Sequence, residues 1–304
     1  MNGYILSYTN PDTDSLCTSI ALSRYLALKG ESFAVVARGN ISAETKYVLD
    51  TLGITDIDTR GEYDAELPVI LVDTHHLAQL PHLKSAERVV AVYDHHPAGD
   101  EFPNAKIDNR VIGAAATIVA EMILADGLMD RTLAALLGSA IISNTAYFES
   151  PSTTEEDKLI FTKLNLYYEF TPEFIGGMFG CKNDILRGTV TEIAESDVKL
   201  FEVEGITVKI AQLELVNVER SLSVSEFYDS LCRTNVLDGC AYYLLSIVDV
   251  LEKKTFVMAL TERDIAFRNA VLGIEGNEAV AVFDRILLRK TDFIPQIKKL
   301  LSRA

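Results

Sequence analysis

The sequence predicts an α/β protein of two domains: a mostly parallel N-terminal sheet with helices on both faces, followed by a smaller C-terminal α/β domain. Three observations lead to this prediction. Short apolar runs alternate with amphipathic stretches over roughly the first hundred residues, the pattern turns helical from about residue 113 to 185, and strand-like runs return from about residue 190. A chain of 304 residues has room for both domains.

Four apolar runs form the expected N-terminal sheet. They are "GYILSYT", "SFAVVARG", "LPVILVDTHH" and "RVVAVYDHH", and helices are expected over residues 14–29 and 43–53 in the connections. Apolar strands joined by helices form parallel sheets that are buried on both faces. Such sheets bind ligands beyond the carboxyl ends of their strands.

The rest of the chain first reads as four helices, namely "GAAATIVAEMILADG", "RTLAALLGSAIISNTAYF", "TTEEDKLIFTKLNLYYEF" and "TPEFIGGMFG". A hairpin-like stretch over residues 198–217, a helix near 224–234, two strands in "AYYLLSIVDVLEKKTFVMALT" and a last strand and helix over 277–301 follow. We therefore expect domains at residues 1–188 and 189–304.

The composition excludes several classes of protein. With 48% apolar and 24% charged residues the chain should fold, and its apolar runs are shorter than the roughly 20 residues of a membrane-spanning helix. The N-terminus has no basic region before an apolar one, which favours the cytoplasm. The four cysteines show neither zinc-site spacing nor the density of a disulfide scaffold. A net charge of −16 argues against nucleic-acid binding and is compatible with a site for divalent cations.

Acids and histidines collect where the strands are expected to end. Asp12 and Asp14 lie in "NPDTD", and four of the five histidines follow Asp73 or Asp94 within three residues. Each motif alone is typical of a turn, a helix cap or a polar strand end. Brought together at one sheet edge, carboxylates and imidazoles are ligands of divalent metals, whose charge offsets the repulsion between the acids. The sequence thus predicts a site for a pair of cations.

These residues resemble a known family. "NPDTDS", the "VD" at 72–73 and "DHH" at 94–96 are similar to the first three motifs of the DHH phosphoesterase superfamily, and "SNTAYFESPSTTEED" at 143–157 is similar to the fourth. Within the superfamily the chain most resembles the manganese-dependent family II inorganic pyrophosphatases, because "IAQLELVN" and "LLRKTDFIPQI" resemble their second domain. The "GGH"-type signature of the nuclease-like branch is absent from the sequence, which favours small phosphoanhydrides over oligonucleotides.

The resemblance implies a role for each site residue. The implied metal ligands are Asp12 for one ion, Asp14 and His95 for the other and Asp73 for both, while His96 would contact substrate, Asp94 would orient its neighbours, and Lys199, Arg289 and Lys290 would bind phosphate. The implied cofactors are two divalent ions, in the first place Mn²⁺, with Co²⁺ or Mg²⁺ as alternatives. The implied reaction is attack of a metal-bridging hydroxide. Substrate would bind in a cleft between the two domains.

Three positions depart from the family pattern. Tyr8 stands where these pyrophosphatases have a histidine, Asn144 where the fourth motif has an aspartate, and Thr291 where a further lysine is usual. A neutral phenol is a poor metal ligand, and an amide oxygen can coordinate but brings no charge, so we expect weaker metal binding. Polyphosphatase-like members of the superfamily also lack the first histidine.

A further histidine leaves two interpretations open. If the strand continues past Asp73, His75 points to the same face and could supply the nitrogen that Tyr8 cannot. Otherwise His75 orients a neighbouring group or lies at the surface.

The sequence therefore favours a metal-dependent hydrolase of pyrophosphate or a related short phosphoanhydride. Two alternatives stay open: an exopolyphosphatase-like hydrolase that acts on longer chains, and a catalytically weak protein that binds a phosphorylated ligand. We expect a small phosphorylated substrate as the partner, neither nucleic acid nor membrane, and a homodimer, as the related pyrophosphatases suggest.

Overall fold

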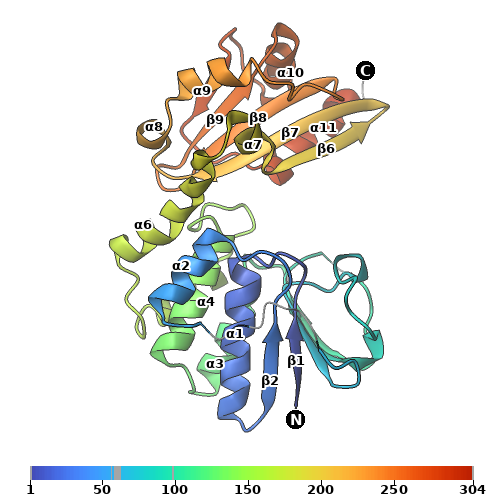
Figure 1. Ribbon diagram of the computed structural model, residues 1–304, viewed down its shortest axis with the longest axis vertical. Helices are drawn as coiled ribbons and strands as arrows, with labels where there is room; N and C mark the ends of the chain where they lie inside the picture. The colour runs from blue at the N-terminus through green and yellow to red at the C-terminus, as the bar shows by residue number, and fades with distance from the viewer. Residues whose placement is uncertain (1, 56, 58–62, 98, 303–304) are drawn as a thin grey trace. The chain divides into compact units, whose positions relative to one another are not determined.

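The computed structural model describes residues 2–55, 57, 63–97 and 99–302. These residues form two compact units, which divide between Met178 and Phe179 inside helix α6 (Pro172–Gly180) (Figure 1). The division lies on the N-terminal side of the boundary expected between residues 188 and 189. Each unit has its own sheet, and the predicted α/β class is confirmed.

The N-terminal unit is built on a parallel sheet in the order β2-β1-β3-β4-β5. Its strands are β1 (Asn2–Leu6), β2 (Ser32–Val36), β3 (Val69–Val72), β4 (Val89–Asp94) and β5 (Lys106–Asn109). The sequence predicted the first four. It missed β5, a short edge strand of mostly exposed residues without an apolar run.

One face of this sheet is covered by helices. The α-helices of the unit are α1 (Thr13–Leu28), α2 (Ala43–Thr51), α3 (Ala115–Ala125), α4 (Arg131–Asn144), α5 (Glu155–Leu164) and α6. Helices α1 and α3 contact the strands, and α4 packs on both of them. Among the described residues, no helix is long and apolar enough to cross a bilayer.

In the described residues, connecting segments and not α-helices cover the other face of the sheet, which corrects the prediction of helices on both faces. Leu71 and Val92 of this face pack against Tyr63, Leu80 and Phe102, which come from the connections around β3 and β4. Within the described parts of these connections the helical turns are the short 3-10 turns η1 (Leu77–Gln79) and η2 (Ala86–Arg88). Proline cannot stand inside an α-helix without breaking it, and prolines at positions 81, 97 and 103 interrupt these segments.

The C-terminal unit has a mixed sheet in the order β10-β9-β8-β7-β6, in which only β7 and β8 are parallel. Its strands are β6 (Val198–Val203), β7 (Ile206–Leu215), β8 (Tyr242–Asp249), β9 (Lys254–Ala259) and β10 (Val280–Phe283). Its helical segments are η3 (Cys181–Arg187), α7 (Val190–Glu195), α8 (Val218–Ser221), α9 (Val224–Leu231), α10 (Glu262–Leu272), the π-turn η4 (Arg289–Phe293) and α11 (Ile294–Leu301). One hydrophobic cluster joins the sheet to α7 and α9, and a second joins it to α10 and α11.

The packing that holds α4 in place can be tested by a substitution at Gly138. A Cβ atom on Gly138 would lie 2.2 Å from the ring of Phe170, whereas one on Gly176 in α6 would meet no atom within 4 Å. We expect Gly138→Ala to lower the free energy of unfolding by about 1–3 kcal/mol, because overpacking outweighs the better helix propensity of alanine. Gly176→Ala is the matched control and should be neutral or stabilising by up to about 1 kcal/mol. Urea unfolding measures both, and equal effects would contradict the packing described.

Candidate metal centre

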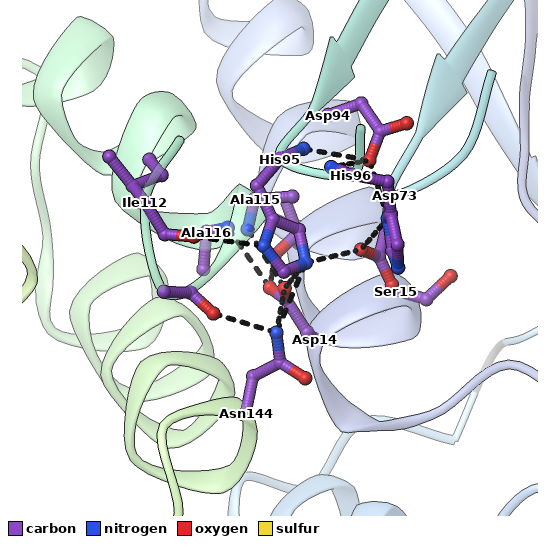
Figure 2. Close-up of polar contacts among 12 residues, drawn as sticks. Asp14, Ser15, Asp73, Asp94, His95, His96, Ile112, Ala115, Ala116 and Asn144 are labelled. Carbon is purple, nitrogen blue, oxygen red and sulfur yellow. Dashed lines mark hydrogen bonds and ion pairs between the residues drawn. The ribbon is translucent and has the colours of Figure 1, made fainter. Parts of the chain in front are cut away.

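Five of the predicted site residues meet at the carboxyl edge of the N-terminal sheet, namely Asp14, Asp73, Asp94, His95 and His96 (Figure 2). Because all its strands are parallel, β3 and β4 end at the same edge, where Asp73 follows β3 and His95 follows β4. His95 Nε2 lies 3.2 Å from Asp73 Oδ1 and 3.9 Å from Asp14 Oδ2. His96 Nδ1 lies 3.7 Å from Asp73 Oδ1. Residues from three separate segments of the chain therefore share one cluster.

His95 turns a single nitrogen toward the carboxylates. Its other ring nitrogen, Nδ1, donates a hydrogen bond to the carbonyl of Ile112 over 3.0 Å. Burial disfavours the charged ring, but the hydrogen bond with Asp73 and the charge of Asp14 outweigh it and raise the pKa of His95 to about 9. Without a metal, Nε2 therefore carries a proton toward Asp73 at neutral pH. A cation bound there would replace this proton.

Asp14 is held by the start of a helix. It lies in the first turn of α1, and its carboxylate accepts hydrogen bonds from the backbone N–H groups of Ala115 (2.8 Å) and Ala116 (2.9 Å) at the beginning of α3. Helix N-termini stabilise negative charge in this way. Asp12 is the N-cap of α1, and its side chain accepts a hydrogen bond from the N–H of Ser15 over 2.9 Å. The helix cap that this motif alone is typical of is thus present at Asp12.

Burial disfavours the charged forms of both Asp14 and Asp73. It raises the pKa of Asp14 to about 6, although the charge of His95 opposes this rise and the charge of Asp12 adds to it. Burial also raises the pKa of Asp73 well above its usual range, with further contributions from Asp14 and Asp12. A divalent cation would reverse both effects by supplying positive charge between the acids.

The backbone at Asp73 turns sharply. Its φ of 61° is left-handed, a conformation that aspartate tolerates better than most residues, and β3 ends one residue earlier at Val72. The strand alternation therefore does not continue to His75. That ring hydrogen-bonds through Nδ1 to Asp94, and its Nε2 accepts the N–H of Gly99 over 2.6 Å. Since both nitrogens face these partners, the structure does not bring His75 into the cluster, and the orienting interpretation fits its contacts.

Asp94 gathers hydrogen bonds from the histidines. It is fully buried and accepts the backbone N–H groups of His95 and His96 as well as Nδ1 of the His96 ring, which lies 2.8 Å away. Burial raises its pKa, but the hydrogen bonds from His96 and His75 outweigh burial and hold it below the usual range. Asp94 thus stays ionised and directs the Nε2 atom of His96 away from itself. These contacts suit the orienting role expected from the sequence.

Both substituted positions lie at the cluster as hydrogen-bond donors. The Tyr8 hydroxyl donates to Asp73 Oδ2 over 3.3 Å, and burial raises the Tyr8 pKa, so the phenol is neutral. Asn144, the last residue of α4, donates to the carbonyl of Gly113 (2.8 Å) and to Asp14 Oδ2 (3.2 Å). Its Nδ2 also lies 3.2 Å from His95 Nε2.

Sequence reasoning missed the residues that hold these groups in place. Asp157 is fully buried, completes the capping box of α5 with the N-cap Thr154, and accepts the N–H of Gly113 and the hydroxyl of Thr117, which fixes the turn before α3. The sequence shows the capping pattern of Thr154 and Asp157. It does not show that Asp157 also contacts the turn before α3. After Asn144, three consecutive residues, Ala146, Tyr147 and Phe148, have left-handed φ values of 47°, 54° and 70°. No glycine marks this turn.

The predicted phosphate-binding residues all lie in the C-terminal unit. Lys199 on β6 and Lys290 in η4 are exposed. Arg289 is 7% exposed, and its guanidinium contacts Asp197 of the same unit.

The donor set suits a divalent metal. Asp73, His95 and His96 each offer one ligand atom, and these atoms lie within 4.8 Å of one another. A mixture of carboxylate oxygen and imidazole nitrogen is suited to first-row divalent ions. Asp14 and Asp12 add carboxylates nearby, while Tyr8 and Asn144 weaken the set because they bring no charge.

Comparisons with known proteins agree with this geometry. The chain matches the model of the DHH family, N-terminal domain, over residues 3–141 and that of the DHHA2 domain over residues 177–300. A Listeria innocua protein named "Probable manganese-dependent inorganic pyrophosphatase" is 30% identical, with 96% of each chain covered. A "Manganese-dependent inorganic pyrophosphatase" of Methanothrix thermoacetophila is 27% identical, with 99% of each chain covered.

Solved structures share the fold. A Methanococcus jannaschii protein named as a family II inorganic pyrophosphatase aligns with a TM-score of 0.69 and 24% identity, with 99% of each chain covered. An exopolyphosphatase-related protein from Bacteroides fragilis aligns with a TM-score of 0.55 and 13% identity, covering 99% of this chain and 92% of the other. The site motifs, the two matched domains and the nearly full-length similarity lead to one conclusion: this chain belongs to the DHH family and carries a C-terminal DHHA2 domain.

Proposed function

We propose that the protein hydrolyses pyrophosphate or a related short phosphoanhydride with the help of divalent cations, Mn²⁺ before Co²⁺ or Mg²⁺. The observation that carries this proposal is the buried cluster in which His95 Nε2 faces Asp73 and Asp14. The chain is also similar over 96% of its length to a relative named for manganese-dependent pyrophosphate hydrolysis.

In this proposal Asp12, Asp14, Asp73 and His95 hold two cations. Bound divalent ions would polarise the phosphoryl oxygens and lower the pKa of a water molecule, which makes it a nucleophile at neutral pH. Asp94 fixes the partly exposed His96 ring through Nδ1, so that Nε2 points away from Asp94 and, in the doubly protonated ring, would donate to a phosphoryl oxygen. The exposed lysines Lys199 and Lys290 would neutralise phosphate charge.

We further propose a cytoplasmic protein that forms a homodimer and binds neither nucleic acid nor membrane. The scattered single cysteines and the net charge of −16 support the compartment and the exclusion of nucleic acid. Light scattering on the purified chain measures the oligomeric state.

Two other activities compete with this proposal. The fold similarity to an exopolyphosphatase-related protein makes hydrolysis of longer phosphate chains the first alternative. The second is phosphate-ligand binding with weak turnover, which the donors Tyr8 and Asn144 favour because they stand where metal ligands are expected.

A phosphate-release assay tests the proposal directly. We expect turnover of pyrophosphate with Mn²⁺ or Co²⁺ that exceeds turnover with Mg²⁺ and with triphosphate or long-chain polyphosphate. Replacing a residue that only supports a metal ligand typically lowers activity roughly 10–100-fold. The Asp73→Ala variant should lose more turnover than this, because in the proposal Asp73 itself holds the cations. Faster release from polyphosphate selects the first alternative. Tight pyrophosphate binding without release at saturating metal selects the second.

The substituted positions provide a gain-of-function test. The double change Tyr8→His and Asn144→Asp should tighten Mn²⁺ binding by at least about tenfold and raise pyrophosphate turnover, because it restores a nitrogen donor and one negative charge. The gain should be smaller with Mg²⁺, which prefers oxygen ligands. Tyr8→Phe is the control: it removes the hydroxyl from Asp73 without adding a ligand. Calorimetry with each metal measures affinity, and a folded double variant that gains no more than the control would show that the site no longer binds metal through these positions.

A further inference from the structure

Arg289 is occupied by contacts within its own unit. Its Nη2 bonds both oxygens of the Asp197 carboxylate at 2.9 and 2.8 Å, and its Nη1 donates to the carbonyls of Asp197 (2.7 Å) and Ile210 (3.3 Å). The guanidinium thus donates four hydrogen bonds, and the residue is 7% exposed. The two Nη atoms of one planar guanidinium bind the carboxylate and the two carbonyls at the same time, a combination for which the single nitrogen of lysine is not suited.

These contacts hold the backbone that carries the two lysines. Asp197 directly precedes β6, and Ile210 of β7 is the register partner of Lys199 on β6. The Asp197 carbonyl also accepts the N–H of Gln212 over 3.1 Å. Gln212 in turn accepts the N–H of Arg289 through its side-chain oxygen over 2.7 Å, and Lys290 is the next residue along the chain. The ion pair therefore ties the strand of Lys199 to the turn of Lys290.

We propose that Arg289 is a positioning residue, whose contacts with Asp197 and Ile210 fix Lys199 and Lys290 as the two cations that bind the phosphate groups of the substrate. This inference rests on the proposed function. It changes the role expected for Arg289 from the sequence, which was direct phosphate binding.

The energetics favour this role over direct phosphate binding. A phosphate that approached the Nη atoms would have to displace the Asp197 carboxylate, whose side chain is 47% exposed, and two backbone carbonyl groups, so that the nearly buried guanidinium would give up four hydrogen bonds. Lys199 and Lys290 are exposed and need no such exchange. A phosphate can therefore pair with the positive charges of the two lysines without breaking the contacts of Arg289 within the C-terminal unit.

The variant Asp197→Asn distinguishes a positioning role of Arg289 from direct phosphate binding by Arg289. The amide keeps the shape of the side chain but removes its charge and one acceptor, so the guanidinium loses its two-oxygen partner. If Arg289 positions the lysines, the Mn²⁺-loaded variant should bind imidodiphosphate, a pyrophosphate analogue that resists hydrolysis, about tenfold more weakly than the wild type. Its Mn²⁺ affinity should be unchanged. Arg289→Gln should weaken binding of the analogue to a similar degree. Lys290→Gln should weaken this binding without lowering the melting temperature.

Glu202→Gln is the matched control, because it removes one negative charge from the exposed part of β6 without touching the ion pair. The proposal is overturned if Asp197→Asn binds imidodiphosphate more tightly than this control, since Arg289 would then be a phosphate ligand that Asp197 restrains. It is also overturned if Asp197→Asn lowers only the melting temperature, which would make the pair purely structural. A wild type that neither binds imidodiphosphate nor releases phosphate from pyrophosphate with any of the three metals would instead refute the proposed function.

Discussion

Buried negative charge at the carboxyl edge of the N-terminal sheet is the constraint on which the site depends. Asp14 and Asp73 are each about 1% exposed, and burial raises the pKa of both. The first N–H groups of α3 donate to Asp14, the Tyr8 hydroxyl donates to Asp73 Oδ2, and the His95 ring forms an ion pair with Asp73 Oδ1. Polar groups removed from water need such partners, and a cation would supply the missing positive charge most directly. The left-handed backbone at Asp73 is strain of the kind that functional sites hold.

Local patterns in the sequence predicted most of the N-terminal fold, because buried parallel strands are continuous apolar runs. They failed where tertiary contacts decide the structure. The edge strand β5 has no apolar run and forms because β4 pairs with it. In the described part of the chain, the second face of the sheet is covered by connections in which prolines disfavour an α-helix. At the site, the sequence indicated which residues gather at the sheet edge. It could not indicate the φ of Asp73, on which the direction of His75 depends.

Arg289 and Lys290 differ in a way that the sequence does not show. The family resemblance implies that both bind phosphate, and in the structure the side chain of Arg289 is buried whereas that of Lys290 is exposed. The difference comes from Asp197, which lies 92 positions earlier in the chain. Tyr8 and Asn144 are similar, because in both cases the hydrogen-bond partner is distant in the sequence and is itself a predicted metal ligand. Their hydrogen bonds to Asp73 and Asp14 stabilise the two carboxylates without adding the positive charge that a metal would bring.

The central claim is that the carboxyl edge of the N-terminal sheet holds the cations. Anomalous diffraction from a crystal soaked in Mn²⁺ measures their positions directly. The account predicts Mn²⁺ within coordination distance of Asp73 and His95 Nε2, with Asp14 or Asp12 completing the contacts of each ion. Ions found elsewhere, with Asp73 still bonded to Tyr8 and His95 still bonded to Asp73, would contradict it.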